Sequence, residues 1–401
     1  MDVVIIGAGQ AGVQVALSLR QKGHEGAITL IGDETHLPYQ RPPLSKAYLK
    51  GETTRDGLTL RPADALAAQG ITLILGTKAT GIDRVAHRVV TDRAPLPYDR
   101  LVLATGTRPR ALTLPGADLP GLYSLRGIED ADALGAALQT ARSVVIIGGG
   151  FIGLEVAATA RAKGLIVTVV EAAPRVMARA VAPTVSAWFE AMHRSMGTTV
   201  LTGAGVAAID GTARVETVVL ADGTRLPADL VLVGIGAMPN AELALGAGLP
   251  CPNGIEVDAQ GRTADPDIFA VGDCSLHPNP YAGGPFRLES VQNAIDQAKA
   301  VAGALTGDVA PYDAVPWFWS DQGSAKLQTT GLPINPDAHV LRGDADQGRF
   351  TVFHLRGGRI IAADSVNMPA DHMAARRLVA ARAVIDPETL ADLAVPLKSL
   401  I

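Results

Sequence analysis

Two stretches of the chain share one pattern of apolar positions followed by glycines. The first runs from Val3 to Gly12 and the second from Val144 to Gly153, and each opens with an unbroken run of valine and isoleucine. Such a run is typical of a parallel strand buried on both faces. The residues that follow, 13–20 and 154–163, are compatible with helices. The pattern predicts the strand–turn–helix start of a dinucleotide-binding fold twice in one chain.

Each glycine of a G-x-G-x-x-G motif has its own role. Gly7 permits a tight turn, Gly9 lets the backbone approach a pyrophosphate, and Gly12 lets the helix pack closely on the strand. The matching residues of the second motif are Gly148, Gly150 and Gly153. The helix that follows each motif offers free amides and the positive end of its dipole to phosphates. Two motifs indicate two dinucleotides in one protein, an arrangement typical of electron transfer between them.

The second strand of each unit is expected to end in a carboxylate that binds a ribose. Asp33 and Glu34 are both candidates in the first unit, and Glu171 is the candidate in the second. A glutamate at this place repels a 2′-phosphate, and Ala172 and Ala173 leave no adjacent arginine to receive one. The sequence therefore predicts NADH rather than NADPH as the substrate. The alternative for each acid is a solvated residue at the end of a strand.

The apolar pattern beyond the motifs is also duplicated. We expect a strand at 71–75, a β-meander at 88–99 and a buried strand at 101–106. After the second motif, a hairpin turn at Asp222-Gly223 and a strand at 230–236 follow the same order. Strand, helix, meander and strand thus occur twice, which predicts two similar α/β domains.

The other segments connect or extend these two units. Residues 36–46 hold three prolines and are expected to form an ordered loop that leads into a short helix. Residues 109–121 resemble a crossing linker. Residues 237–311, with a strand at 267–273 and a helix at 291–305, lack a motif of their own and are expected to complete the first domain.

The last part of the chain is expected to be a small α+β domain. Its predicted elements are strands at 347–355 and 359–364 and a helix at 371–383. The expected domains are 1–108 with 237–311 for the first dinucleotide, 109–236 for the second, and 312–401 at the C-terminal end.

Composition and charge exclude several classes of protein. The chain has 401 residues, 48% of them apolar and 19% charged, and a net charge of −5, which describes a globular enzyme without a nucleic-acid signature. Glu155 and several glycines interrupt the most apolar stretch, 143–160, so we expect no membrane span. The first strand begins by Val3 and leaves no room for a signal peptide, so we expect a cytoplasmic protein.

The two cysteines, Cys251 and Cys274, narrow the chemistry further. Neither lies in the first 250 residues or in a metal-binding spacing, so we expect no redox-active disulfide beside the first motif, no iron–sulfur cluster and no metal site. Burial in a reducing compartment is the simpler role for both.

Several motifs together resemble a known family. Besides the first glycine motif they are 41–46 (Arg-Pro-Pro-Leu-Ser-Lys), 104–106 with 234–236, 271–274 (Val-Gly-Asp-Cys) and 316–322 (Pro-Trp-Phe-Trp-Ser-Asp-Gln). In this order they resemble the FAD-dependent, NADH-linked ferredoxin reductases of bacterial oxygenase systems, the putidaredoxin reductase-like group. The resemblance covers essentially the whole chain. It implies an α/β flavoprotein of the glutathione reductase type, with two Rossmann-like domains and a small α+β C-terminal domain.

The resemblance also implies which residues hold the two cofactors. Those implied for bound FAD are Gly7, Gly9, Ala11, Gly12, Asp33, Arg41, Lys46, Ala79, Thr105, Gly106, Arg126, Asp273, Val291 and Trp319. Those implied for NADH are Gly148, Gly150, Ile152, Gly153, Glu155, Glu171 and Gly236.

Lys46, Glu155 and Trp319 are the candidates for a direct part in the reaction. Glu155 follows the second motif inside an apolar run, and we expect it on the first turn of its helix. A buried carboxylate is costly unless it is paired, and Lys46 is the natural partner if both face the flavin. Such a pair could orient the nicotinamide and stabilise negative charge on reduced flavin. The alternative is that Glu155 only complements the helix N-terminus.

The expected reaction carries electrons from NADH through FAD to another protein. Hydride transfer is the cofactors' own chemistry, and the chain has no metal centre, so a one-electron acceptor has to be a separate protein. The resemblance names a 2Fe–2S ferredoxin, which in turn serves a cytochrome-type monooxygenase or a Rieske dioxygenase. We expect Trp317 and Trp319 in the wall between flavin and ferredoxin, and a monomer or weak dimer. Candidate docking residues for an acidic ferredoxin are Lys326, Arg342, Arg376, Arg377 and Arg382.

Two other functions remain open from the sequence. One is an NADH oxidase, quinone reductase or small-molecule reductase of the same fold. The other is a signalling flavoprotein like the apoptosis-inducing factors, which carry a targeting leader and an enlarged C-terminal domain.

Overall fold

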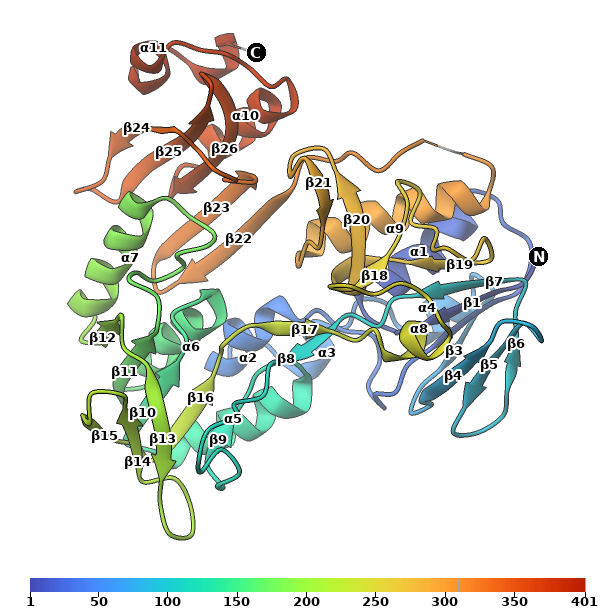
Figure 1. Cartoon of the computed structure of the whole chain (residues 1–401), viewed down its shortest axis with the longest axis horizontal. Helices are drawn as coiled ribbons and strands as arrows, with labels where there is room; N and C mark the ends of the chain where they lie inside the picture. The colour runs from blue at the N-terminus through green and yellow to red at the C-terminus, as the bar shows by residue number, and fades with distance from the viewer. Residues whose placement is uncertain (309, 401) are drawn as a thin grey trace. The chain divides into compact units, whose positions relative to one another are not determined.

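The computed structural model describes residues 1–308 and 310–400, which form two compact units (Figure 1). The first unit contains residues 1–40, 55–108 and 238–316. The second unit contains residues 41–54, 109–237 and 317–401, of which 401 lies outside the described part. The chain therefore passes between the units several times.

A parallel sheet forms the centre of the first unit. Its order is β19-β7-β1-β2-β3, and its strands are β1 (Val3–Ile6), β2 (Ile28–Ile31), β3 (Ile71–Ile74), β7 (Arg100–Leu103) and β19 (Ile268–Ala270). Each strand runs parallel to its neighbours, and Ile268 pairs with Leu101. The segment after residue 237 therefore returns to the first sheet, as the sequence predicts.

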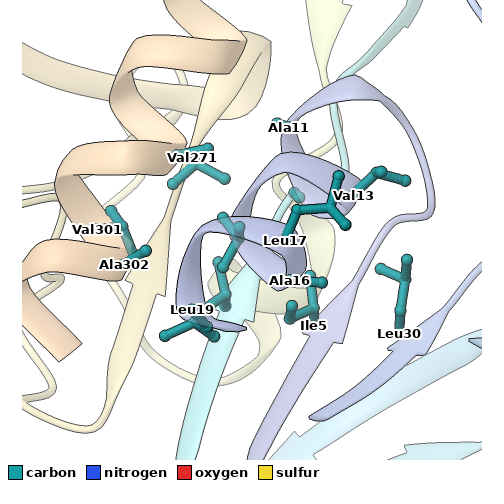
Figure 2. Packing of buried hydrophobic residues seen from close by; sticks show 14 of the residues in the cluster. Ile5, Ala11, Val13, Ala16, Leu17, Leu19, Leu30, Val271, Val301 and Ala302 are labelled. Carbon is teal, nitrogen blue, oxygen red and sulfur yellow. The ribbon is translucent and has the colours of Figure 1, made fainter. Parts of the chain in front are cut away.

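Two helices cover one side of this sheet, α1 (Gln10–Gln21) and α9 (Val291–Leu305). Figure 2 shows Val13 and Leu17 of α1 beside Ile5 and Leu30 of the strands, with Val301 of α9 in the same cluster. The side chain of Ile5 is fully buried, which explains why β1 has no polar position.

The other elements of the first unit are short. One antiparallel sheet has β4 (Ala79–Asp83), β5 (Arg88–Thr91) and β6 (Leu96–Pro97). Strands β5 and β6 lie in the meander predicted at 88–99, whereas β4 precedes it and was not predicted. Another sheet has β18 (Ile255–Glu256), β20 (Ser275–Asn279) and β21 (Gly284–Phe286). The short helices are α3 (Arg55–Leu58), α4 (Ala63–Ala67), α8 (Glu242–Gly246) and the 3-10 turn η2 (Gly272–Cys274). Strands β8 (Thr107–Pro109) and β17 (Ala237–Pro239) pair with each other.

The second unit contains a similar parallel sheet. Its order is β12-β11-β10-β16-β9, and its strands are β9 (Leu122–Tyr123), β10 (Ser143–Ile147), β11 (Ile166–Glu171), β12 (Thr199–Thr202) and β16 (Leu230–Val233). Its helices are α5 (Ile128–Thr140), α6 (Phe151–Ala162) and α7 (Pro183–Ser195). The meander is β13 (Val206–Asp210), β14 (Thr217–Leu220) and β15 (Arg225–Pro227). The turn at Asp222-Gly223 joins β14 to β15, so the predicted duplication is confirmed.

The C-terminal residues of the second unit form an antiparallel sheet with helices. The sheet order is β22-β23-β26-β25-β24, with β22 (Trp317–Gln322), β23 (Ala325–Gly331), β24 (Ala338–Asp344), β25 (Arg349–Arg356) and β26 (Arg359–Val366). The helices are α10 (Pro369–Ala380), α11 (Pro387–Ala391) and the 3-10 turn η3 (Leu397–Leu400).

Three details of this unit differ from the sequence analysis. Strands β22, β23 and β24 were not predicted. Burial along β22 and β23 does not alternate cleanly, and in β24 one of the alternating buried positions holds a charged residue, Arg342. Helix α10 begins at Pro369 rather than 371, since proline suits the first turn of a helix. Residues 42–45 form a 3-10 helix (η1, Pro42–Ser45) before α2 (Ala47–Lys50), although the prolines predicted no regular element there.

Candidate functional site: two glycine cradles and a buried carboxylate

The first glycine motif has room for a ligand at only one of its three glycines. A Cβ on Gly7 would lie 2.2 Å from the carbonyl oxygen of Ala104, and a Cβ on Gly12 would lie 2.0 Å from that of Gly7. A Cβ on Gly9 would meet nothing within 4 Å. Packing thus excludes side chains at the outer glycines, and the middle glycine faces open space where a pyrophosphate can approach.

The second motif repeats this geometry. A Cβ on Gly148 would lie 2.3 Å from the carbonyl oxygen of Gly234, and a Cβ on Gly153 would lie 2.2 Å from that of Gly148. A Cβ on Gly150 would have no other atom within 4 Å. Ile152, also assigned to NADH by the resemblance, is 46% exposed.

The helix that follows each motif also fits an anionic ligand. Helices α1 and α6 begin after Gly9 and Gly150, and neither has a side-chain cap or an acidic residue in its first turn. Their first amide groups are therefore available to a phosphate, whose charge the helix dipole stabilises. Ala11 lies on the first turn of α1 and packs into the core. The residues present fit one dinucleotide at each motif.

The structure separates the two acids at the end of β2. The Tyr39 hydroxyl donates to Glu34 Oε2 at 2.5 Å, whereas Asp33 is exposed. Of these two residues, Asp33 has the carboxylate that is open to solvent and to a ribose.

Glu171, at the end of β11, is held by the backbone around it. Its Oε2 accepts from the Gly149 amide and its Oε1 from the Ala173 amide, each at 2.7 Å. The next arginine along the chain, Arg175, donates to the carbonyl oxygens of Val181 and Ala178. Arg175 is thus engaged by its own loop, and this residue does not oppose the sequence-based expectation that Glu171 disfavours a 2′-phosphate.

Glu155 is a buried carboxylate of the second unit with several hydrogen-bond donors around it. Its side chain is 3% exposed. Oε2 accepts from Lys46 Nζ at 2.8 Å and from Ser45 Oγ at 2.5 Å, and Oε1 accepts from Ser320 Oγ at 2.6 Å. Glu155 is the fifth residue of α6, so it lies on the second turn rather than the first. The carboxylate binds these three donors and does not serve the helix N-terminus.

A second layer of polar side chains lies behind Ser320. Gln322 Nε2 donates to Ser320 Oγ at 3.2 Å, and Gln322 Oε1 lies 2.9 Å from His193 Nε2. Burial lowers the pKa of His193, while the hydrogen bond to Gln322 opposes that shift. A neutral His193 whose Nε2 carries the proton donates to Gln322 and thereby fixes the orientation of its amide.

Sequence reasoning identified Lys46 and Glu155 but missed Ser45, Ser320, Gln322 and His193. Three of these four stand inside motifs that carried the resemblance, namely 41–46 and 316–322. Membership in these motifs was the one sequence feature that could have pointed to Ser45, Ser320 and Gln322. Nothing in the sequence tells which hydroxyl of a motif faces a carboxylate more than 100 positions away.

The remaining candidates of the first unit lie at or next to the ends of strands and helices. Thr105 Oγ1 donates to the Asn240 oxygen at 2.6 Å, and Gly106 has a φ of +65°, which glycine adopts without strain. Asp273 lies in η2 and accepts from Thr107 at 3.5 Å. Val291 is the first residue of α9, whose N-cap is Ser290, and Ala79 begins β4.

The remaining candidates of the second unit lie in three places. Arg41 Nη1 donates to the Arg126 oxygen at 2.9 Å, which places these two residues together. Gly236 has a φ of +108° and open space beside it. Trp319 stands on β22, half-buried, with its ring 5.7 Å from that of Trp317.

The candidate docking residues do not all reach the surface. Lys326, Arg377 and Arg382 are exposed, and Arg376 lies over the Trp317 ring at 5.0 Å. Arg342 is 4% exposed; it donates to Asp371 and to the carbonyl oxygens of 390, 392 and 395. The prediction that Arg342 contributes to a docking surface is wrong, because a guanidinium can cap several buried carbonyl groups of its own fold.

Two further expectations concern cysteines and membranes. Both cysteines are free, and Cys274 is fully buried. Among the described residues, no cluster of histidine, cysteine and acidic side chains could hold a metal ion. In the same part of the chain, no helix combines the length and apolar character needed to span a bilayer.

Comparison with known proteins places the chain in a family. Residues 1–298 match the family described as pyridine nucleotide-disulphide oxidoreductase, and residues 317–401 match the family described as reductase C-terminal. Rhodocoxin reductase of Rhodococcus erythropolis is 49% identical over 98% of this chain and 92% of its own length.

Two solved structures are similar over the whole chain. The ferredoxin reductase for the CYP199A2 system from Rhodopseudomonas palustris has a TM-score of 0.97 at 48% identity, covering 100% of this chain and 99% of that one. The reductase in a covalent putidaredoxin reductase–putidaredoxin complex has a TM-score of 0.96 at 44% identity, covering 100% and 97%. The chain belongs to the pyridine nucleotide-disulphide oxidoreductase family, within its putidaredoxin reductase-like group of ferredoxin reductases.

Proposed function

We propose that this protein is an NADH-dependent ferredoxin reductase that holds FAD at its first glycine motif and NADH at its second. The observation that carries the proposal is the pair of matching cradles, each with an open middle glycine before an uncapped helix. The absence of a cysteine in the first 250 residues separates the chain from family members that work through a disulfide. The FAD-binding domain then corresponds to 1–108 with 237–311, the NAD-binding domain to 109–236, and the C-terminal domain to 312–401.

The chain's own residues bind and orient the two cofactors. Gly9 and the start of α1 receive the FAD pyrophosphate, with Asp33 on its ribose, and Gly150 with Glu171 receive NADH. Lys46, held by Glu155, supplies positive charge where reduced flavin develops negative charge. Bound FAD supplies the redox chemistry, since it can accept electrons in pairs and release them singly.

The proposed electron acceptor is a 2Fe–2S ferredoxin that serves an oxygenase of the cytochrome type. A similar reductase has been solved in covalent complex with putidaredoxin, which supports a ferredoxin as the partner class. Exposed Lys326, Arg377 and Arg382 provide positive charge for an acidic partner. We propose a cytoplasmic protein that works as a monomer or weak dimer.

Single-turnover kinetics test the proposal. The purified protein is expected to be yellow, to bleach when mixed with NADH without oxygen, and then to reduce a 2Fe–2S ferredoxin faster than oxygen or a quinone. If the reduced protein transfers electrons to a quinone faster than to the ferredoxin, the protein is a quinone reductase rather than a ferredoxin reductase. A protein that stays colourless when supplied with FAD would overturn the whole proposal.

A further inference from the structure

We propose that Ser320 and Gln322 are positioning residues of the nicotinamide site: they fix the carboxylate of Glu155 and through it the ammonium group of Lys46. The inference rests on the proposed function and deepens it. It assigns a part in the reaction to the C-terminal sheet, which contains neither glycine motif. Neither residue needs to contact a cofactor for this role.

The hydrogen bonds between His193, Gln322, Ser320 and Glu155 have a defined donor-to-acceptor direction. Gln322 Nε2 donates to Ser320 Oγ, so the hydroxyl proton of Ser320 is directed toward Glu155 Oε1, where the separation is 2.6 Å. Gln322 is oriented in turn by His193, 2.9 Å from its Oε1. In this series of hydrogen bonds, each residue donates to the next one, from His193 through Gln322 and Ser320 to Glu155. A carboxylate that ends such a chain is held as an acceptor in a single orientation.

The two oxygens of the Glu155 carboxylate accept from different donors. Ser320 satisfies Oε1, and this leaves Oε2 for Ser45 and Lys46. Lys46 also donates to the Pro42 oxygen at 3.2 Å, so its ammonium group is tied from two sides. Without Ser320, Oε1 would lack its donor on a side chain that is only 3% exposed, and the carboxylate would turn toward the Lys46 ammonium group and draw it from its place.

Gln322 also contacts the loop at the other end of the proposed NADH site. Its Nε2 lies 3.6 Å from Met177 Sδ. The Met177 amide donates to the Gly149 oxygen at 2.9 Å, and Gly149 is the residue whose amide binds Glu171. Gln322 thus stands between the carboxylate near the nicotinamide end and the loop near the adenosine end. Of these contacts of Gln322, the hydrogen bond to Ser320 is the one that leads directly to the charged carboxylate of Glu155.

The test compares Ser320→Ala, Ser320→Thr and the control Ser365→Ala. Ser365 is also a buried serine of the C-terminal sheet, but its hydroxyl accepts from Thr351 Oγ1 at 3.0 Å and is remote from the Glu155 cluster in the hydrogen-bond network. In Ser320→Ala we expect the limiting rate of flavin reduction by NADH to fall about tenfold, with a much smaller change in the NADH dissociation constant. Ser320→Thr keeps the hydroxyl and is expected to recover most of the rate.

The second readout is the midpoint potential of bound FAD, measured by equilibrium titration with a redox dye. When the carboxylate draws Lys46 away, less positive charge stabilises reduced flavin, so the potential of Ser320→Ala is expected to become more negative. The shift is expected to be absent in Ser365→Ala. If Ser320→Ala does not fold, Gln322→Met gives the answer, because it removes the amide that orients the Ser320 hydroxyl and is expected to shift rate and potential in the same direction by less.

The outcomes separate this inference from the proposed function. A wild-type protein that NADH cannot reduce would defeat the proposed function, and the inference with it. A wild-type protein that works as proposed, beside a Ser320→Ala or Gln322→Met protein with unchanged limiting rate and potential, would defeat the inference alone. Equal losses in Ser320→Ala and Ser365→Ala would likewise assign Ser320 a purely structural role.

Discussion

The carboxylate of Glu171 accepts a hydrogen bond from the backbone amide of Gly149 across 2.7 Å. The residue expected to bind the adenosine ribose is thereby joined to the glycine motif expected to bind the pyrophosphate. Strand β11 ends, and the motif turns, at the same edge of the sheet, because the carboxyl ends of parallel strands lie side by side.

The first prediction concerns the choice of nicotinamide nucleotide. Glu171→Gln keeps the shape and removes the charge that repels a 2′-phosphate, so the NADH-to-NADPH ratio of kcat/KM is expected to fall by about tenfold or more. Full conversion to NADPH is not expected, since Arg175 is engaged by carbonyl groups. Steady-state kinetics with both nucleotides measure this. A ratio equal to that of the wild type would show that specificity comes from elsewhere.

The second prediction separates packing from binding at the first motif. Gly9→Ala adds a methyl group to open space, so the melting temperature of the protein without FAD is expected to change little, while the dissociation constant for FAD rises at least about tenfold. Gly7→Ala puts a Cβ against the Ala104 oxygen and is expected to destabilise the fold itself. Flavin release measured by fluorescence, and melting curves, distinguish the two. Equal FAD affinity in Gly9→Ala and the wild type would contradict the assigned cradle.

The third prediction concerns the ammonium group of Lys46. Lys46→Met retains the length of the side chain but leaves the Glu155 carboxylate without its cation, so flavin reduction by NADH is expected to slow by about tenfold to a hundredfold. Lys50→Met, at an exposed lysine one turn along, is the matched control. Stopped-flow absorbance measures both, and an unchanged rate in Lys46→Met would remove Lys46 from the reaction.

The fourth prediction concerns ionic strength. Reduction of an acidic ferredoxin is expected to slow as salt is raised from about 0.01 M to 0.15 M, because the Debye length falls from about 30 Å to about 8 Å, whereas flavin reduction by NADH is expected to change much less. Arg377→Glu on α10 is expected to weaken the salt dependence, while Arg88→Glu on β5 serves as a control at another exposed arginine. Equal salt dependence of the two half-reactions would argue against electrostatic docking.

The fifth prediction concerns acid stability. Burial lowers the pKa of His277 to about 4, from an ordinary value near 6.5. The unfolded chain binds this proton more readily than the folded chain, so the stabilising contribution is fully present above pH 6.5 and is lost as the pH falls toward 4. His277→Gln is expected to remove about 2 kcal/mol of the stability difference between pH 7 and pH 5. Urea unfolding at the two pH values measures this, and identical pH dependence in variant and wild type would contradict it.

Local patterns predicted the parallel cores of both units well. The runs Val3–Ile6 and Val144–Ile147 were predicted as strands buried on both faces, and the helix at 291–305 was predicted with the bounds of α9. The strands of the C-terminal sheet were harder, since β22 has no clean alternation of buried and exposed positions. The prediction that Arg342 is exposed was wrong because charge alone does not determine burial. Backbone carbonyl groups from residues 390–395 bind its guanidinium group inside the fold.

The sequence alone determined the two glycine motifs, because glycine spacing is a local property of each strand–turn–helix segment. The residues that close the two turns, Ala104 and Gly234, come from the ends of other strands. The sequence also determined that no disulfide could work beside the first motif. Only the tertiary structure decided which donors surround Glu155 and which acid after β2 is left open. The donors around Glu155 lie more than 100 positions away from it in the sequence. Asp33 is left open because the Tyr39 hydroxyl binds its neighbour Glu34. Tertiary packing sets both arrangements, and no periodic pattern in the sequence predicts them.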